Sequence, residues 1–245
     1  MIWLYDGSWD GLLSAVFQAY NDQSADIQSH ESFSGCSMFP VRTVETSPIQ
    51  VDRLRRGMER LSPQLPVTAY RAFLSEQPGR ENALLNTLRI GFAHNRDPLP
   101  LLQEPPIQLL CGLAGRVSNE ERLFLGIIRF SRASKDLYCA DIEPDYCILP
   151  LMGRHFHMRF NDQHLIIRDL KRRLALLSTP QEWWMANLLD ETQAPLPKDD
   201  EMSALWRAYF QAIANPARKN PKLQQRFVPL KYRTHITEFQ MDPPK

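Results

Sequence analysis

The residues best suited to chemistry lie near the C-terminal end of the chain, where cationic, amide and aromatic side chains are interleaved. The cations and the aromatic residues among them are Arg218, Lys219, Lys222, Arg226, Phe227, Tyr232 and Arg233. Guanidinium and ammonium groups bind phosphates, and aromatic rings stack on bases. The formal net charge of the whole chain is only +1, so this concentration of cations is local. The segment is predicted to bind nucleic acid; a solvated basic tail is the alternative.

A second set of candidate groups lies between residues 154 and 173. His155 and Arg159 are four residues apart, so they share one face of a helix, and Arg154 stands beside them. This cationic patch could bind a phosphate and extend the nucleic-acid surface, or it could be an ordinary exposed helix face. Asp169 stands among basic residues and could pair with arginine or act with His155 as an acid/base group.

No pattern in the sequence requires a cofactor, and we expect none. The cysteines form no Cys-x-x-Cys pair of the kind typical of structural zinc or iron–sulfur sites; they are Cys36, Cys111, Cys139 and Cys147. Asp141, Glu143 and Asp145 alternate as magnesium ligands on a strand could, but we predict no metal site. The segment 6–8 lacks the glycines and lysine of a phosphate loop and is interpreted as a turn with Ser8 as a helix N-cap.

Composition indicates an ordinary globular protein. The chain has 245 residues, of which 43% are hydrophobic and 23% are charged, which is enough to bury one large core or two modest ones. The apolar run at residues 1–5 is too short for a signal sequence, and no stretch approaches the roughly 20 apolar residues of a membrane span. We expect a soluble, cytoplasmic protein without membrane contact.

Hydrophobic periodicity predicts the elements that must position these residues. The first half is expected to contain strands at 2–5 and 38–46 and helices at 9–20, 51–61, 67–74 and 84–92, followed by a proline-rich linker at 98–106. The second half is expected to contain a helix at 109–122, strands at 125–130, 137–142, 164–169 and 174–177, and an amphipathic stretch at 151–160. A linker at 190–200 and a helix at 205–213 complete the chain.

Together these elements predict an α+β fold, with a central helix packed on an antiparallel meander and a C-terminal amphipathic helix with a basic tail. We interpret residues 1–245 as one α+β unit. It can be subdivided into a mixed N-terminal part, a helix with an antiparallel sheet, and a C-terminal helix with the basic segment, at 1–97, 107–189 and 201–240.

Several ordered motifs are shared with a known family. They are Tyr5-Asp6-Gly7-Ser8, Leu88-Arg89-Ile90-Gly91-Phe92, Ile142-Glu143-Pro144-Asp145, His155-Phe156 with Arg159-Phe160, and Asn220-Pro221-Lys222-Leu223-Gln224. On these motifs, which extend over nearly the whole chain, the protein resembles a bacterial family catalogued as DNA metabolism or DNA repair proteins. Members of that family are typically encoded beside a radical S-adenosylmethionine (radical SAM) protein, and similar domains are fused to a uracil-DNA-glycosylase-like domain.

The resemblance implies a DNA-repair accessory protein that binds DNA and positions it for a radical SAM partner. Two alternatives stay open: a nucleic-acid-processing enzyme that uses Asp169 and His155, and a protein-docking subunit without nucleic-acid contact. The chain departs from the family pattern at Arg122, Leu125 and Tyr146, where relatives tend to carry histidine, lysine and histidine. The shared candidates are therefore His155, Arg159, Asp169 and the C-terminal basic segment.

Overall fold

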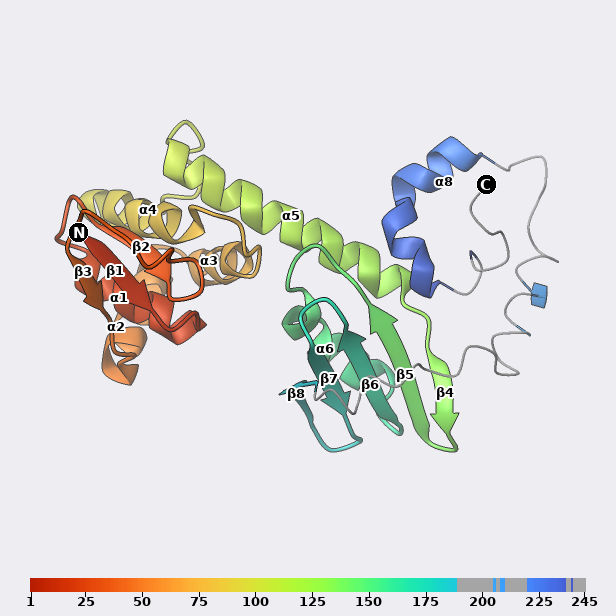
Figure 1. Cartoon of the computed structure of the whole chain (residues 1–245). Coiled ribbons are helices and arrows are strands. Elements are labelled where there is room, and N and C mark those ends of the chain that lie inside the picture. Colours follow the sequence, from red (N-terminus) through yellow and green to blue (C-terminus); the bar gives the residue numbers. More distant parts are fainter. Residues whose placement is uncertain (189–204, 206–207, 210–219, 237–238, 240–245) are drawn as a thin grey trace. The chain divides into compact units, whose positions relative to one another are not determined.

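The computed structural model describes residues 1–188, 205, 208–209, 220–236 and 239 (Figure 1). Helices and strands are both present in an α+β arrangement, which confirms the predicted fold class. The predicted linker at 190–200 and most of the predicted helix at 205–213 lie outside the described residues. Of the helices that are described, none is both long enough and apolar enough to cross a bilayer.

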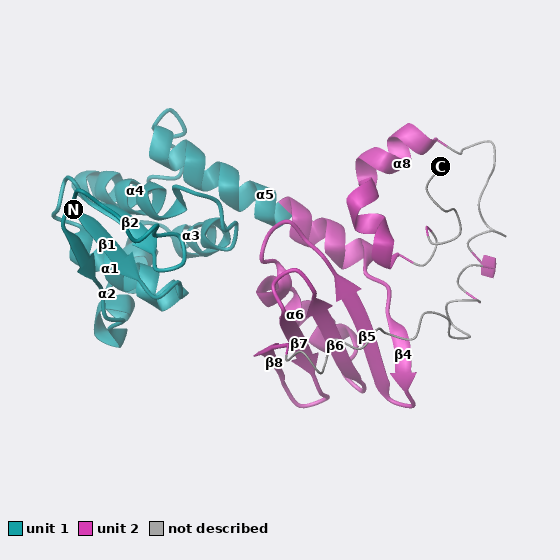
Figure 2. Cartoon of the chain, viewed as in Figure 1, with its two compact units in different colours: residues 1–118 teal, residues 119–245 magenta. Residues whose placement is uncertain are grey.

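The chain divides into two compact units, residues 1–118 and 119–245 (Figure 2). The division falls inside α5 (Pro105–Ile127), the longest of the described helices. The proline-rich segment at 98–106, which we predicted as a linker, therefore lies within unit 1 and does not separate the two units.

Unit 1 is built on a three-stranded parallel sheet of order β2-β1-β3, comprising β1 (Ile2–Tyr5), β2 (Asp26–Ser29) and β3 (Val41–Thr43). All four residues of β1 are buried, as expected of a central strand that is covered on both faces. The helices of this unit are α1 (Trp9–Ala19), α2 (Pro48–Leu61), α3 (Leu65–Phe73) and α4 (Arg80–His94), followed by the first part of α5. The predicted elements are all present here, and β2 is an addition.

The turn between β1 and α1 has its polar groups paired. The Ser8 hydroxyl accepts a hydrogen bond from the Gly11 N–H at 2.9 Å, which confirms the predicted N-cap. The Asp6 carboxylate in turn accepts from the Ser8 N–H and from the Thr46 hydroxyl, each at 2.9 Å. This turn therefore ties the end of β1 to the segment that follows β3.

Unit 2 contains a five-stranded sheet of order β4-β5-β6-β7-β8. The strands are β4 (Ser131–Ser134), β5 (Leu137–Ile142), β6 (His164–Asp169), β7 (Leu174–Ser178) and β8 (Trp183–Asn187). Neighbouring strands are antiparallel except β5 and β6, which are parallel. The prediction of a purely antiparallel meander was wrong, because α6 (Leu149–Arg159) crosses between β5 and β6 and returns the chain in the same direction.

The prediction of a strand at 125–130 was also wrong. α5 continues to Ile127, and the Ile128 N–H still donates to the Phe124 carbonyl at 3.1 Å, which is helical bonding. The β-branched pair Ile127-Ile128 favours a strand locally, but the buried ring of Phe124 holds this turn in the helix. The actual strand, β4, begins four residues after α5 ends.

Helix α6 packs on one face of the sheet and approaches β8 through a glycine. A Cβ atom built on Gly153 would lie 2.3 Å from a ring carbon of Trp183, so a side chain here must displace the indole. The opposite case is Gly126 in α5, where an added Cβ would meet nothing within 4 Å.

We expect Gly153→Ala to lower the free energy of unfolding by about 1–2 kcal/mol. Overpacking costs about 1–3 kcal/mol, whereas the better helix propensity of alanine returns up to about 1 kcal/mol. Urea denaturation followed by tryptophan fluorescence measures the change. The matched variant Gly126→Ala should be neutral or stabilising, and equal stability of the two variants would contradict the packing argument.

The described C-terminal residues form a short helix and a 3₁₀ helix, α8 (Pro221–Phe227) and η3 (Leu230–His235). Asn220 caps α8, since its side-chain oxygen accepts from the Leu223 N–H at 3.0 Å. No residue of α8 is buried, whereas η3 contacts β5 and buries Tyr232.

Candidate functional site

The best-organised polar region of unit 2 is the loop Glu143–Tyr146, between β5 and α6. Glu120 of α5, which is only 6% exposed, fixes its backbone. One carboxylate oxygen accepts from the Asp145 N–H at 2.7 Å and the other accepts from the Tyr146 N–H at 2.8 Å. A buried carboxylate therefore holds the two successive N–H groups of this loop in place.

A second buried carboxylate holds the same loop through an arginine. Asp169, at the end of β6, is fully buried, and it accepts from both the backbone N–H and the guanidinium of Arg172 at 3.1 Å each. The guanidinium also donates to the carbonyls of Pro144 and Asp145, at 3.1 and 2.6 Å. Burial raises the pKa of Asp169, and the charge of Arg172 opposes that rise. The side chain of Asp169 thus serves to position Arg172 and the loop.

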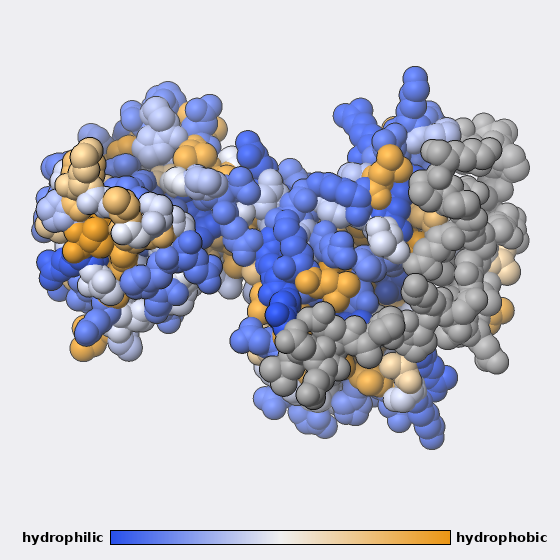
Figure 3. Space-filling model, in the orientation of Figure 1, coloured by the Kyte–Doolittle hydropathy of each residue, from blue (hydrophilic) through white to orange (hydrophobic). Residues whose placement is uncertain are grey.

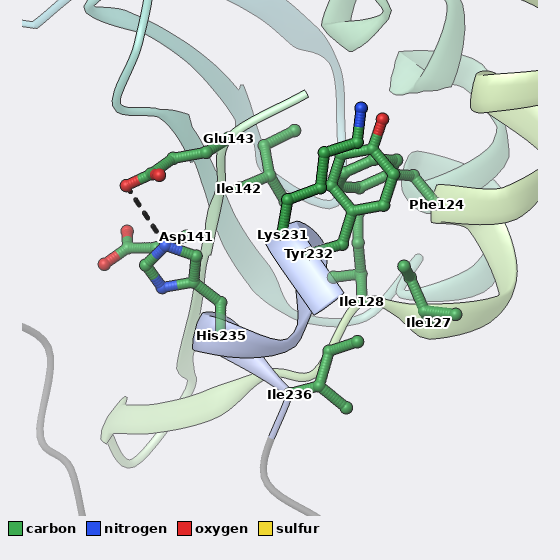
Figure 4. A pocket seen from close by; sticks show the side chains of 10 residues that line it. All are labelled: Phe124, Ile127, Ile128, Asp141, Ile142, Glu143, Lys231, Tyr232, His235 and Ile236. Atoms are coloured by element: carbon green, nitrogen blue, oxygen red, sulfur yellow. Dashed lines mark hydrogen bonds and ion pairs between the residues drawn. The ribbon is translucent and has the colours of Figure 1, made fainter. Parts of the chain in front are cut away.

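Helix η3 contacts the loop through three of its side chains. The Tyr232 hydroxyl donates to Glu120 and lies 3.1 Å from an oxygen of Asp145, and Lys231 forms an ion pair with Asp145. His235 lies 3.3 Å from Glu143, the contact drawn as a dashed line in Figure 4. Helix η3, which begins three residues after α8 ends, is therefore bound to the loop by three separate side chains.

Charge and burial tune the groups at this attachment. Burial is the main cause that raises the pKa of Tyr232, and the carboxylates of Glu120 and Asp145 raise it further. Burial also acts to raise the pKa of Asp145, but the hydrogen bond and charge of Lys231 and the bond from Tyr232 outweigh it and lower that pKa. At neutral pH, Asp145 is therefore an ionised acceptor and Tyr232 a neutral donor. These groups suit a fixed joint between η3 and the Glu143–Tyr146 loop, and they do not suit proton transfer.

A small pocket lies beside this joint (Figure 4). Its apolar lining comes from the end of α5, from β5 and from η3, and consists of Phe124, Ile127, Ile128, Ile142, Tyr232 and Ile236. The charged groups at its rim already have partners, because Asp141 pairs with Arg168 at 2.6 Å and Glu143 pairs with His235. In the part of the chain that the structure describes, no group of three or more His, Cys, Asp or Glu side chains could hold a metal ion.

The predicted cationic patch is exposed but stands apart from η3. Arg154, His155 and Arg159 are exposed on α6. His157 of the same helix contacts Ser178 at 3.0 Å, and the strand register places Asp141, which lines the pocket beside η3, on the opposite face of the sheet from Ser178. The sheet therefore lies between this patch and η3.

The proposed acid/base pair is not assembled. Among the described residues, neither a hydrogen bond nor an ion pair joins His155 to Asp169. The ring of His155 contacts Phe156, with centroids 5.0 Å apart, whereas Asp169 is bound to Arg172. The predicted pairing of Asp169 with arginine is the interpretation that the structure confirms.

The C-terminal residues that we predicted to bind nucleic acid differ in their exposure. Lys222, Arg226 and Phe227 are exposed on α8, whereas Arg218 and Lys219 lie outside the described residues. Tyr232 is buried, with its ring edge-on to Phe124 at 4.9 Å, so in this structure its ring is a packing element and is not open for base stacking. Arg233 is half-buried; it donates to the Val228 carbonyl at 3.0 Å and its guanidinium lies 4.2 Å from the Phe239 ring.

Sequence reasoning did not select several residues of this site, namely Glu120, Glu143, Asp145, Arg172, Lys231 and His235. A signal for Glu120 does exist in its spacing. It continues the buried positions Leu113 and Val117 and precedes the buried Phe124, so it is a carboxylate in the apolar stripe of α5. A charged residue in such a stripe must find hydrogen-bond partners inside the fold.

Comparison with known proteins adds a family assignment. Residues 78–238 match the family model described as a domain of unknown function, DUF4130, and this match covers more than half of the chain. The chain belongs to the DUF4130 family. The matched range begins just before α4 and contains the whole joint between the Glu143–Tyr146 loop and η3. No curated protein and no solved structure matches the chain.

Proposed function

We propose that this DUF4130 protein is an accessory protein of DNA repair or DNA metabolism that binds nucleic acid and acts with a radical SAM partner. The observation that supports it is helix α8, all of whose residues are exposed. Its exposed side chains include two cations, Lys222 and Arg226, and the aromatic ring of Phe227. A helix with no buried face gains nothing from the core, so its surface composition is available for a ligand. The partner and the repair context rest on the family resemblance of the shared motifs.

The joint supports the same proposal. Lys231 and Tyr232 hold the residues after α8 on the Glu143–Tyr146 loop. Holding a binding element in one arrangement before the ligand arrives reduces the ordering cost of binding. The alternative of an enzyme that uses Asp169 and His155 gains no support, because Asp169 is fully buried and paired with Arg172.

Replacing Lys222 and Arg226 together by alanine is expected to weaken binding to all DNA sequences alike. Each lost phosphate contact should reduce the slope of log K against log salt by about 0.9 on duplex DNA, or about 0.7 on single strands. Fluorescence anisotropy of a labelled oligonucleotide over a salt series measures both quantities.

The control variant removes two exposed arginines of α2, Arg55 and Arg60, and so changes the net charge equally. Its salt slope should stay at the wild-type value. An unchanged slope in the α8 variant would refute the placement of phosphates there. If the protein does not bind DNA at low salt and a protein partner still co-purifies after nuclease treatment, α8 is a protein-docking element and not a DNA-binding one.

A further inference from the structure

Helix α8 carries two parallel rows of side chains. Lys222 and Arg226 are four residues apart, and so are Leu223 and Phe227, so each pair lies one above the other on the helix. The second pair is well exposed, with 48% of Leu223 and 66% of Phe227 accessible. A cationic row and an apolar row therefore run side by side along this helix.

The apolar row continues past the end of the helix. Leu230, the first residue of η3, is also exposed, so three large apolar side chains are uncovered within eight residues. Figure 3 shows apolar surface flanked by strongly hydrophilic side chains in the region of α8. Scattered exposed apolar residues are ordinary, but a row aligned with cations indicates a ligand that is charged along one side and apolar along the other.

The two kinds of nucleic acid differ in this respect. In a duplex the base faces are stacked inside the helix, and the phosphates are what a surface helix meets first. A single strand can present phosphates along one side and unstacked base faces along the other. Only the single strand offers something to both rows at once.

We propose that α8 binds single-stranded nucleic acid in preference to duplex, with phosphates on Lys222 and Arg226 and a base stacked on Phe227. This inference rests on the proposed nucleic-acid function and assigns its substrate class. The attachment of η3 supports it, because Lys231 and Tyr232 fix η3, which begins three residues after α8 ends, on the Glu143–Tyr146 loop. Arg233 of η3 also donates to the carbonyl of Val228, the C-cap of α8, so the end of α8 that carries Phe227 is tied to η3 before a ligand binds.

The test measures the binding of three labelled probes of equal length to the full chain over a salt series: a mixed-sequence single strand, its duplex, and a single strand of abasic nucleotides. The wild type should bind the mixed single strand most tightly. Phe227→Ala should weaken that complex by about 10-fold or more, as expected from the loss of one stacked base, and leave the other two within about twofold. Its salt slope should equal that of the wild type, because no phosphate contact is lost.

Phe39 of unit 1 supplies the matched control, since its ring is also 66% exposed. Phe39→Ala should bind all three probes like the wild type. Duplex binding as tight as single-strand binding, or an equal loss on all three probes with Phe227→Ala, would overturn this inference and leave the proposed function standing. Failure of the wild type to bind any probe at low salt would overturn the proposed function as well.

Discussion

Replacing Arg172 by alanine is expected to lower the free energy of unfolding at pH 7 by about 4 kcal/mol, within the range for removal of one partner of a buried ion pair. The Arg172 side chain is 9% exposed and Asp169 is fully buried. Without the guanidinium, the Asp169 charge loses its neutralising partner, and the carbonyls of Pro144 and Asp145 lose a shared donor. Urea denaturation of the full chain measures the loss.

The pH dependence of this loss identifies its cause. Burial raises the pKa of Asp169 and Arg172 opposes the rise, so the variant should have a still higher folded-state pKa. The folded variant then binds a proton more readily than the unfolded chain, whose aspartate titrates near about 3.9. Its stability deficit should therefore stay constant above that raised pKa and shrink as the pH falls through it.

The double variant Asp169→Asn/Arg172→Ala provides the control, because it removes the buried charge together with its partner. It should be more stable at pH 7 than Arg172→Ala alone, and its deficit should not depend on pH in this way. If the single variant shows the same deficit at every pH, the buried charge is not what Arg172 compensates.

Replacing Glu120 by glutamine is the second change with a large expected effect, a loss of about 3 kcal/mol. The carboxylate accepts from the N–H groups of Asp145 and Tyr146 and from the Tyr232 hydroxyl. An amide has one acceptor oxygen, so its NH2 group must face at least one of these donors. Each buried donor left without an acceptor costs about 1–3 kcal/mol.

Because the Tyr232 hydroxyl exchanges a charged acceptor for, at best, a neutral amide oxygen, Glu120→Gln should also loosen η3 from the Glu143–Tyr146 loop. Hydrogen exchange of residues 230–236 should then become faster than the change in global stability alone explains. Glu182→Gln makes the same chemical change at an exposed carboxylate of unit 2 and should shift stability by less than about 0.5 kcal/mol. Wild-type exchange at η3 in Glu120→Gln would show that η3 is held by its other contacts.

Local patterns in the sequence predict much of the fold. Ser8 was identified as an N-cap and is one, and the strand at 164–169 has the bounds of β6. Both follow from local chemistry, a hydroxyl before an amphipathic run and a β-rich segment before a turn. By contrast, β2 contains a single aliphatic residue, Ile27, and β8 was not predicted. The direction of β6 relative to β5 depends on where α6 crosses, which no local pattern contains.

The joint was less accessible to prediction than the fold. Glu120 and Tyr232 are 112 positions apart, and Lys231 and Asp145 are 86 apart. Spacing within one element predicts which residues share a face, but it cannot show which distant elements meet. For that reason Tyr232 was assigned to the basic surface by its neighbours in sequence, whereas its contacts place it inside.

The parallel pairing of β5 with β6 also governs how unit 2 can assemble. Short turns join β4 to β5, β6 to β7 and β7 to β8, so those pairings close small loops. Residues 143–163, including α6, must be looped out before β5 can meet β6, so this closure carries the largest entropic cost among the four strand pairings. The hairpin β4–β5 and the meander β6–β7–β8 therefore join only when α6 has crossed between them. Non-local closure of this kind slows folding. The Glu143–Tyr146 loop opens this crossover, so η3 has a complete docking partner only once the slowest pairing is made.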